Sequence, residues 1–405
     1  MSAPDPSTYF RKGFGLKSEV EQTLSADYTG HLVDLLRARD FTLTAGDVTV
    51  RLAREFGFCY GVERAVEYAY QTRAKFPDRR IYLAGEIIHN PHVNAKLREM
   101  GIVFLQPGEQ GFDYSEVQPE DVVILPAFGV TIGDFETLRG LGCVMVDTTC
   151  GSVLNVWKRV ENYARDGFTS LIHGKYYHEE TRATASQVAK HPGGSYLVVR
   201  NMEQARDVCD YIEGTELSRD AFLERYRKQA SPGFDPDVDL ARVGVANQTT
   251  MLARESLAIG EEIGLAMARR FGEAHRAAHF RTFDTICSAT QDRQDAVNEL
   301  LLEPLDVMLV IGGYNSSNTI SLAALCAERV TTYHVADAAC IDPARGAIRH
   351  VSTGAAEEVE TSGWLTRSGA LRVGITAGAS TPNNKIGEAV ARVFATRGID
   401  PATVG

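Results

Sequence analysis

The chain has 405 residues, which is more than one hydrophobic core usually supports, so we expect two or three domains. Its formal net charge of −11 disfavours a general nucleic-acid binder, which normally presents a basic face. No run approaches the roughly 18 apolar residues of a membrane span, and the N-terminus lacks the pattern of a secretory signal, so we expect a cytoplasmic protein that binds neither membranes nor nucleic acid.

Residues 1–47 are polar and weakly periodic, and we interpret them as an N-terminal extension outside the core, with a helix over residues 26–39. From residue 48 onward, short apolar runs alternate with helical patterns, which predicts an α/β fold with small parallel sheets. The expected strands lie at residues 48–53, 81–84, 122–125, 144–146, 170–174, 196–199, 243–246, 280–285, 307–311 and 371–376. The expected helices lie at residues 62–75, 93–100, 153–165, 251–271, 291–302 and 319–328, and after residue 382.

This pattern restarts twice, so we predict three α/β domains that share one central site. Their expected boundaries are residues 48–149, 150–284 and 285–405. The charged residues 201–240 and the irregular residues 337–369 interrupt the pattern. We interpret the first segment as an insertion or a helical elaboration and the second as another insertion.

The seven cysteines form an odd set without paired spacing, which disfavours a disulfide framework and favours thiols, a metal site or catalysis. Cys59, Cys150 and Cys287 each follow a strand and precede a helix. Two of them end nearly matching tetrapeptides, Asp147-Thr148-Thr149-Cys150 and Asp284-Thr285-Ile286-Cys287. A single cysteine at such a place is more often a buried thiol, but the repeat favours a shared function. The remaining cysteines lack this pattern, and we interpret them as structural: Cys143, Cys209, Cys326 and Cys340.

Three converging thiolates would select zinc, copper(I) or an iron–sulfur cluster. A structural zinc site normally takes its ligands from closely spaced cysteine pairs, which are absent here. Three cysteines on a four-iron cluster would leave one iron without a protein thiolate, open to substrate as a Lewis acid. The spacing alone does not decide among these metals.

Neutral or switchable hydrogen-bond donors gather just beyond the strand ends, and such a set suits a phosphate-bearing ligand. Each Ser, Thr or Asn taken singly is more often a helix cap, but their recurrence in three units favours binding. Glu180 lies among them and either handles protons or is a solvated carboxylate. The donors are His89, His178, Thr249, Thr250, Asn315, Ser316, Ser317, Asn318 and Ser380.

In their order along residues 48–390, these motifs resemble those of the 4-hydroxy-3-methylbut-2-enyl diphosphate reductase family. The residues in the N-terminal extension at 11–15 and in the insertion at 231–236 resemble the cyanobacterial and plant branch of that family. The motifs that carry the resemblance are Phe56-Gly57-Phe58-Cys59-x-Gly61-Val62-x-Arg64-Ala65, Ile88-His89-Asn90-Pro91, Asp147-x-Thr149-Cys150, His178-x-Glu180, Gln248-Thr249-Thr250, Asp284-Thr285-Ile286-Cys287-x-Ala289-Thr290-Gln291-x-Arg293-Gln294, Asn315-Ser316-Ser317-Asn318 and Gly378-Ala379-Ser380-x-Pro382.

The resemblance implies a trefoil of three α/β domains around a [4Fe–4S] cluster held by Cys59, Cys150 and Cys287, with one iron lacking a protein thiolate. It implies the last step of the methylerythritol phosphate route of isoprenoid biosynthesis. In that step 4-hydroxy-3-methylbut-2-enyl diphosphate loses its hydroxyl as water, with two electrons, and yields isopentenyl and dimethylallyl diphosphate. The branch favours ferredoxin as the one-electron donor protein, with flavodoxin as the alternative.

The resemblance also implies a role for each matching residue. Glu180 would supply the proton that lets hydroxide leave as water, Thr249 would fix the substrate hydroxyl and relay that proton, and His178 would lie near the diphosphate and the proton path. The short bacterial branch has a histidine where this chain has Phe128, so one diphosphate contact is lost or replaced, by water or by Thr131. The diphosphate itself would be bound by His89, Ser316, Asn318 and Ser380, with Ser317 and Thr250 among the substrate-binding residues.

Two rival functions remain at this point. A hydro-lyase or quinolinate-synthase-like enzyme would use the same kind of three-cysteine cluster without net electrons. A structural zinc site or an iron–sulfur sensor would need neither the loop donors nor Glu180.

Overall fold

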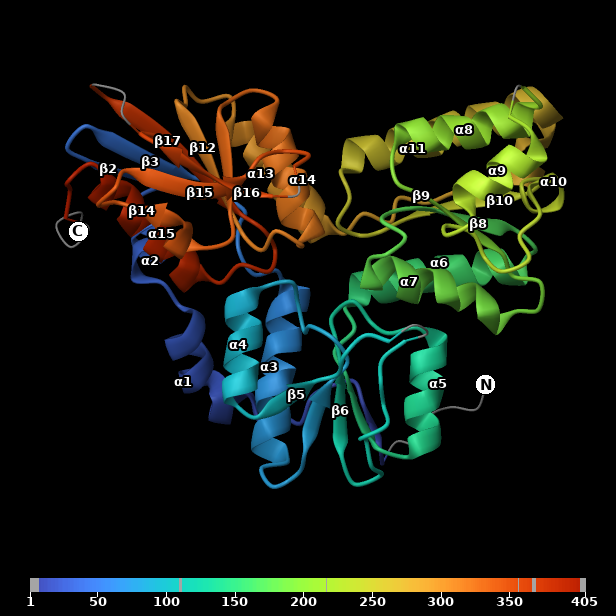
Figure 1. The fold of residues 1–405 in the computed structure, drawn as a ribbon, viewed down its shortest axis with the longest axis horizontal. Helices are drawn as coiled ribbons and strands as arrows, with labels where there is room; N and C mark the ends of the chain where they lie inside the picture. The colour runs from blue at the N-terminus through green and yellow to red at the C-terminus, as the bar shows by residue number, and fades with distance from the viewer. Residues whose placement is uncertain (1–6, 109–110, 216, 356, 366–368, 401–405) are drawn as a thin grey trace. The chain divides into compact units, whose positions relative to one another are not determined.

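The structure is a computed structural model that describes residues 7–108, 111–215, 217–355, 357–365 and 369–400 (Figure 1). The described strands form several small sheets in which parallel pairing predominates, which confirms the predicted α/β fold. The chain divides into two compact units. Unit 1 comprises Met1–Arg11, Asp78–Ile87 and Ile102–Cys287, and unit 2 comprises Lys12–Pro77, Ile88–Gly101 and Ser288–Gly405. The boundaries of three domains stay a prediction.

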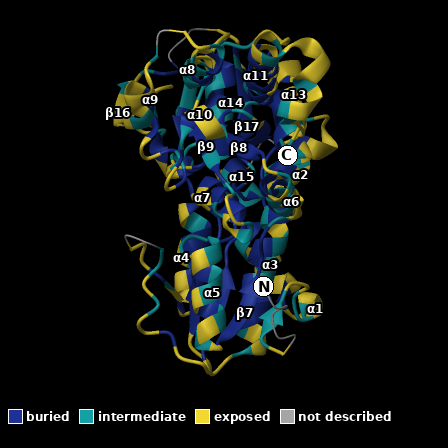
Figure 2. Cartoon of the chain, turned by 90° about the vertical axis from the view of Figure 1, so that its right-hand side faces the viewer, coloured by how far each residue is buried: buried dark blue, intermediate teal, exposed yellow. Residues whose placement is uncertain are grey.

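The first sheet of unit 1 has the strand order β1-β7-β6-β4-β5, and all of its pairs are parallel. Its strands β6 and β7 are buried along their whole length, and Figure 2 shows β7 in the colour of buried residues. Their residues are apolar, as a strand covered on both faces requires, except for Asp147 at the end of β7. The strands are β1 (Tyr9–Phe10), β4 (Ile81–Leu83), β5 (Ile102–Phe104), β6 (Val122–Leu125) and β7 (Val144–Asp147).

The second sheet of unit 1 has the parallel order β11-β10-β8-β9. In Figure 1, α6 (Gly151–Arg165) and α7 (Glu179–Ser186) cover one face, and α8 (Met202–Glu213) and α11 (Ala253–Phe271) cover the other. The predicted insertion at 201–240 is a helical elaboration, because α8, α9 (Arg219–Tyr226) and α10 (Pro236–Asp239) occupy it. The strands are β8 (Thr169–His173), β9 (Tyr196–Val199), β10 (Val243–Asn247) and β11 (Phe280–Thr282).

Unit 2 contains one sheet with the order β14-β15-β13-β12-β17-β3-β2, and β16 pairs with β15. Its centre is parallel, and antiparallel strands are added at both edges. The strands are β2 (Thr42–Ala45), β3 (Val48–Leu52), β12 (Val307–Ile311), β13 (Thr332–Val335), β14 (Ile341–Asp342), β15 (Ala347–Val351), β16 (Glu358–Ser362) and β17 (Leu371–Ala377).

Strand β12 has a core on each face, because successive side chains of a strand point to opposite sides. Leu309 and Ile311 belong to the core with α2 (His31–Ala38) and α15 (Asn383–Thr396). Met308 and Val310 belong to the core with α13 (Ser288–Leu300) and α14 (Ser317–Ala327). The remaining α-helices are α1 (Lys17–Tyr28), α3 (Tyr60–Lys75), α4 (Pro91–Glu99), α5 (Ile132–Leu141) and α12 (Arg276–His279).

The N-terminal extension is part of the core, so the prediction that it lies outside is wrong. Val33 and Leu36 of α2 have no exposed surface, and they pack in the core of unit 2. The single helix expected over residues 26–39 is instead two helices, α1 and α2. The two helices are separated at Thr29 and Gly30. Gly30 packs closely on α15, because an added Cβ would lie only 2.5 Å from the backbone oxygen of Asn383.

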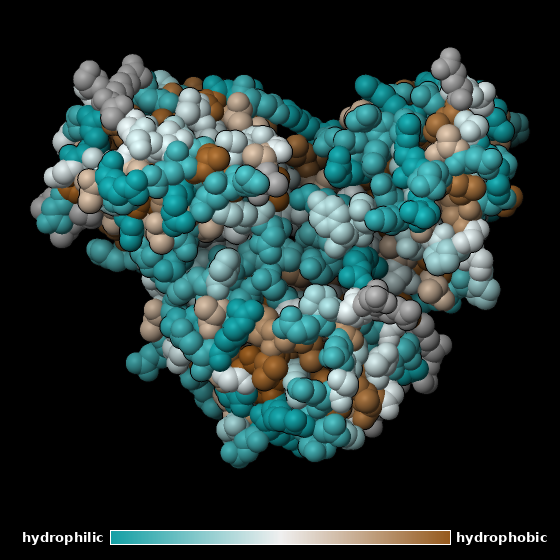
Figure 3. All heavy atoms as spheres, viewed as in Figure 1, coloured by the Kyte–Doolittle hydropathy of each residue, from teal (hydrophilic) through white to brown (hydrophobic). Residues whose placement is uncertain are grey.

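The prediction that residues 337–369 are irregular is also wrong, because β14, β15 and β16 form an antiparallel ribbon there. Strand β16 is mostly exposed, so its sequence Glu-Val-Glu-Thr-Ser lacks the apolar pattern that marks a buried strand. Charged side chains on an edge strand also hinder pairing with another chain. Within the described residues no helix is both long and apolar enough to cross a membrane. Figure 3 accordingly shows hydrophilic residues over most of the face in view, with hydrophobic ones in small groups.

Candidate active site

Cys59, Cys150 and Cys287 occupy the same place relative to two neighbouring parallel strands. Each follows one strand, and its backbone N–H donates to the carbonyl of the second residue after the neighbouring strand. The carboxyl end of a parallel sheet is where α/β folds bind ligands. The three donor–acceptor pairs are Cys59 with Ala379 (3.2 Å), Cys150 with Ala127 (3.0 Å) and Cys287 with Thr249 (3.4 Å).

The repeated aspartate has a structural reason. Asp147 Oδ1 accepts a hydrogen bond from the N–H of Thr149 at 2.9 Å, and Asp284 Oδ1 accepts one from the N–H of Ile286 at 3.0 Å. Each aspartate therefore closes a turn with the amide two residues further on, directly before the cysteine. The two turns differ in exposure, since Asp147 is buried and Asp284 is exposed.

The exposure of the cysteines separates these three from the other four. Cys59, Cys150 and Cys287 are partly exposed, whereas Cys143, Cys209, Cys326 and Cys340 are buried, and no disulfide joins any of the seven. Burial raises the pKa of Cys143 to about 11 and the pKa values of Cys209 and Cys326 to about 12. These three buried residues stay protonated thiols at neutral pH, and only a thiolate is a good metal ligand.

Glu180 is a buried carboxylate, only 1% exposed, held by a second predicted site residue. Its Oε1 accepts a hydrogen bond from the N–H of Thr249 at 2.6 Å, and the carbonyl of Thr249 accepts one from the N–H of Cys287. Thr249 thus connects the buried carboxylate of Glu180 to the Cys287 turn. His178 caps α7, and its Nδ1 accepts from the N–H of Glu180 at 3.1 Å. Because Nδ1 is an acceptor there, the neutral ring carries its proton on Nε2.

Gln248 fixes the loop that carries Thr249 and Thr250. Its side-chain oxygen accepts from the N–H of Lys175 at 3.1 Å and from the hydroxyl of Thr181 at 3.0 Å. Its amide nitrogen donates to Thr250 Oγ1 at 2.9 Å. Gln248 was not among the predicted site residues, although it lies in a motif that carried the resemblance.

Phe128, the position at which the resemblance implied a lost diphosphate contact, packs against His178. The two rings meet edge to face, with centroids 5.6 Å apart and planes at 79°. The next residue must be glycine, since Gly129 has a φ of +76° and an added Cβ would approach the ring of Trp157 to 2.3 Å. In this chain the phenyl ring therefore packs against one edge of the His178 site.

Unit 2 gathers the predicted diphosphate-binding side chains into one hydrogen-bonded cluster. The Ser380 hydroxyl donates to the backbone oxygen of His89 at 3.1 Å and lies 3.5 Å from Ser316 Oγ. The side-chain amide of Asn315 lies 3.3 Å from His89 Nδ1. Asn318 accepts from the N–H of Ala379 at 2.9 Å, which ties the first turn of α14 to the loop after β17.

This cluster lies at the start of α14, where Ser316 is the N-cap and accepts from the N–H of Thr319. The first N–H groups of a helix have no partner within the helix and favour an anion. Ser317 and Asn318 occupy this first turn and are buried. The cluster has no side chain with a permanent charge, so it offers hydrogen bonds and the helix dipole.

Arg293 is a structural residue of this region to which the sequence assigned no role. It is 3% exposed and donates to the carbonyl of Gly57 at 2.7 Å and to that of Ala289 at 2.8 Å. These two bonds join the turn that carries Cys59 to the first turn of α13. Arg293 lies in the motif at residues 289–294 that carries the family resemblance, and this position could have identified it from the sequence.

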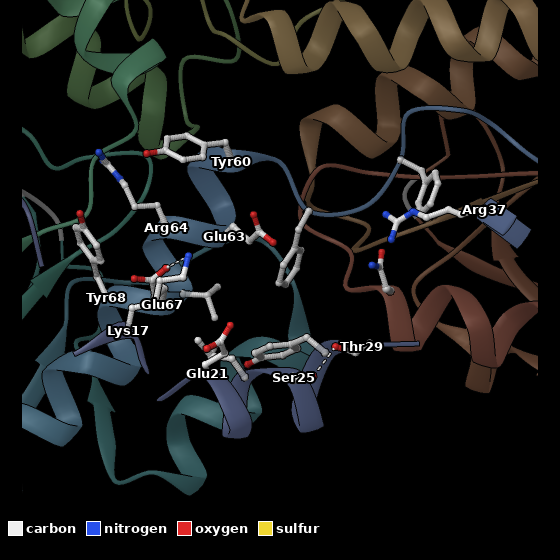
Figure 4. A pocket seen from close by; sticks show the side chains of 16 residues that line it. Lys17, Glu21, Ser25, Thr29, Arg37, Tyr60, Glu63, Arg64, Glu67 and Tyr68 are labelled. Carbon is white, nitrogen blue, oxygen red and sulfur yellow. Dashed lines mark hydrogen bonds and ion pairs between the residues drawn. The ribbon is translucent and has the colours of Figure 1, made fainter. Parts of the chain in front are cut away.

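A cavity of about 600 Å³ lies beside the Cys59 turn, between α1 and the first turns of α3 (Figure 4). Tyr60, which is 78% exposed, stands at its edge, and Lys17 and Glu67 form an ion pair of 3.5 Å along its wall. None of the predicted diphosphate donors lines it. This cavity is therefore separate from the donor cluster.

Each unit contains part of the predicted site. Unit 1 holds Cys150, His178, Glu180, Thr249, Thr250 and Cys287, and unit 2 holds Cys59, His89, Ser316, Ser317, Asn318 and Ser380.

Known proteins resemble the chain over nearly its whole length. A family model described as LytB protein matches residues 50–394. The 4-hydroxy-3-methylbut-2-enyl diphosphate reductase of Gloeobacter violaceus is 50% identical over 96% of this chain and 93% of its own length. The enzyme of the same name from Thermosynechococcus vestitus is 48% identical over 96% of this chain and 95% of its own.

Solved structures agree with these relatives. One, of (E)-4-hydroxy-3-methyl-but-2-enyl diphosphate reductase, the terminal enzyme of the non-mevalonate pathway, is 29% identical with a TM-score of 0.51, covering 85% of this chain and 98% of that one. A reductase structure from Plasmodium falciparum shares the fold at 21% identity and a TM-score of 0.61, covering 85% of this chain and 87% of that one. The chain therefore belongs to the 4-hydroxy-3-methylbut-2-enyl diphosphate reductase family of oxidoreductases.

Proposed function

We propose that the chain removes the hydroxyl group of 4-hydroxy-3-methylbut-2-enyl diphosphate reductively and yields isopentenyl and dimethylallyl diphosphate, the last step of the methylerythritol phosphate pathway. The observation that carries this proposal is the buried carboxylate of Glu180, hydrogen-bonded at 2.6 Å to the residue whose carbonyl holds the Cys287 turn. A buried acid beside a cysteine turn is costly without a function, and a proton-consuming reaction provides one.

Cys59, Cys150 and Cys287 would hold a [4Fe–4S] cluster. Three soft thiolate donors, partly exposed at equivalent turns, fit this group, whereas the other four cysteines are buried. When bound, such a cluster supplies one-electron transfer and an iron that lacks a protein thiolate and can act as a Lewis acid.

Glu180 and Thr249 would handle the proton that must leave with the hydroxyl as water. The Thr249 N–H holds one oxygen of the Glu180 carboxyl group, so the group is fixed and its proton can be delivered from a defined position. The Thr249 hydroxyl would bind the substrate hydroxyl and relay the proton. His178 would donate from Nε2 toward the diphosphate, because its Nδ1 is occupied by the N–H of Glu180.

His89, Ser316, Asn318 and Ser380 would bind the diphosphate, with Ser317 and Thr250 beside them. Hydrogen bonds in unit 2 already connect the first four residues to one another or to neighbouring loop residues. They therefore need little rearrangement to present their donors together. Preorganised donors at a helix N-terminus suit a phosphate group. The electrons would come from a one-electron carrier protein, ferredoxin or alternatively flavodoxin.

Reductant dependence separates this reaction from that of a hydro-lyase with the same cluster. We expect anaerobically purified protein to convert the diphosphate substrate to both products with a one-electron reductant, and to form neither product without it. Turnover without reductant would favour the hydro-lyase, and a colourless protein with stoichiometric zinc would favour a structural metal site.

A further inference from the structure

The N-terminal strand contacts the turn that carries Cys150 through one buried carboxylate. The Tyr9 hydroxyl donates to Asp147 Oδ2 at 2.5 Å, and Arg11 Nε lies 3.5 Å from the same oxygen. The other oxygen of Asp147 accepts from the N–H of Thr149 and closes the turn before Cys150. One side chain thus joins the N-terminal strand to the cysteine turn, and it is only 6% exposed.

Tyr9 is held in the orientation that this bond requires. Strand β1 pairs in parallel with β7, with Tyr9 opposite Met145, and the Met145 N–H donates to the carbonyl of Thr8 at 2.7 Å. The Tyr9 ring packs edge to face on Phe135, with centroids 5.6 Å apart. Burial, followed by the charge of Asp147, raises the pKa of Tyr9, so its hydroxyl remains a donor at physiological pH.

The second aspartate turn of the chain offers an internal comparison. Asp284 makes the same bond to the amide two residues on, but it is exposed, so water can solvate its other oxygen. Asp147 is buried, so its second carboxylate oxygen depends on protein donors in place of water. Arg11 is half exposed and its ion pair is long, which makes the Tyr9 hydrogen bond the stronger of the two contacts.

We propose that Tyr9, assisted by Arg11, is a positioning residue for Cys150, and that it acts through Asp147 on the stability and the electron affinity of the cluster. The inference rests on the proposed function, because it takes Cys150 as a cluster ligand. Without the Tyr9 hydroxyl, Asp147 loses a partner for its buried charge, and the turn that presents Cys150 loosens. The less compensated negative charge also lowers the reduction potential of a cluster nearby.

The test compares Tyr9→Phe with Tyr211→Phe in the holoenzyme. Tyr211 also donates to an aspartate, Asp237, at 2.5 Å, but it lies in the helical insertion, far along the chain from each cysteine turn. Cluster loss to a chelator is followed under anaerobic conditions by the visible absorbance, with iodoacetamide present to trap each released thiol for mass spectrometry.

Tyr9→Phe is expected to lose its cluster roughly 10-fold faster than the wild type, with Cys150 alkylated first and a lower midpoint potential. Tyr211→Phe is expected to match the wild type in all three readouts. In an Asp147→Asn background, which keeps the oxygen that accepts from Thr149, Tyr9→Phe should add little.

Each alternative outcome identifies which claim fails. A wild-type protein without a cluster would overturn the proposed function. A wild-type cluster together with wild-type behaviour of Tyr9→Phe would overturn only the inference. A full Tyr9→Phe effect in the Asp147→Asn background would also overturn it, because the hydroxyl would then act by another route.

Discussion

Glu180→Gln is expected to lower turnover by about 10²- to 10⁴-fold while the cluster and the affinity for the diphosphate substrate stay close to those of the wild type. Glutamine keeps the side-chain oxygen that accepts from the Thr249 N–H, so the loop and the adjoining Cys287 turn remain in place. It removes only the exchangeable acid proton. Single-turnover kinetics with pre-reduced enzyme measure the chemical step, and the substrate-induced change in the cluster spectrum measures binding.

Glu203→Gln provides the matched control for this variant. Glu203 is an exposed glutamate in the first turn of α8, just as Glu180 lies in the first turn of α7. Neutralising it removes one carboxylate charge at the start of a helix of unit 1 and leaves the buried acid unchanged, so turnover should stay within a few-fold of the wild type. Near-normal turnover of Glu180→Gln, or an equal loss in both variants, would refute the proton role of Glu180.

Cys287→Ser is expected to lose most of the cluster absorbance and its bound iron after anaerobic reconstitution. A serine oxygen is a harder and weaker ligand for such a cluster than a thiolate. The backbone bond from residue 287 to Thr249 does not involve the side chain, so the fold should survive, as circular dichroism can verify.

Cys340→Ser is the control that removes a thiol outside the proposed set of cluster ligands. Cys340 is buried, and its sulfur lies 3.7 Å from the Tyr314 hydroxyl and from Glu358 Oε1, partners that a serine hydroxyl can also use. Its cluster content should equal that of the wild type. An intact cluster spectrum in Cys287→Ser would remove Cys287 from the ligand set.

The sequence identified the three cysteine turns but not what holds them. The Asp-Thr-x-Cys repeat is local, and its turn geometry depends on residues two apart, so it could be detected in the sequence. The carbonyl that each cysteine N–H uses lies two residues beyond the end of a neighbouring strand. For Cys59 that strand is β17, which pairs with β3 in register Leu371 to Val48. Pairing between such distant segments depends on the packing of the whole sheet, and no local pattern encodes it.

The N-terminal strand escaped detection for a different reason. Strand β1 has only two residues, too few to display an alternating pattern, and its role depends on Asp147 far along the chain. The loop donors could be recognised as a class, because Ser, Thr, Asn and His beyond strand ends suit an anion. Their mutual contacts, such as Ser380 with the backbone of His89, follow only from the folded loops.

Mössbauer spectroscopy of the anaerobic, ⁵⁷Fe-reconstituted protein, recorded with and without the diphosphate substrate, shows whether one iron of the cluster lacks a cysteine ligand and binds the substrate. Three cysteine ligands on a four-iron cluster predict one iron site with distinct parameters, and those parameters should change when the substrate is added. Four equivalent iron sites whose parameters do not change with substrate, or a protein without a cluster, would rule out a three-cysteine cluster with a substrate-binding iron.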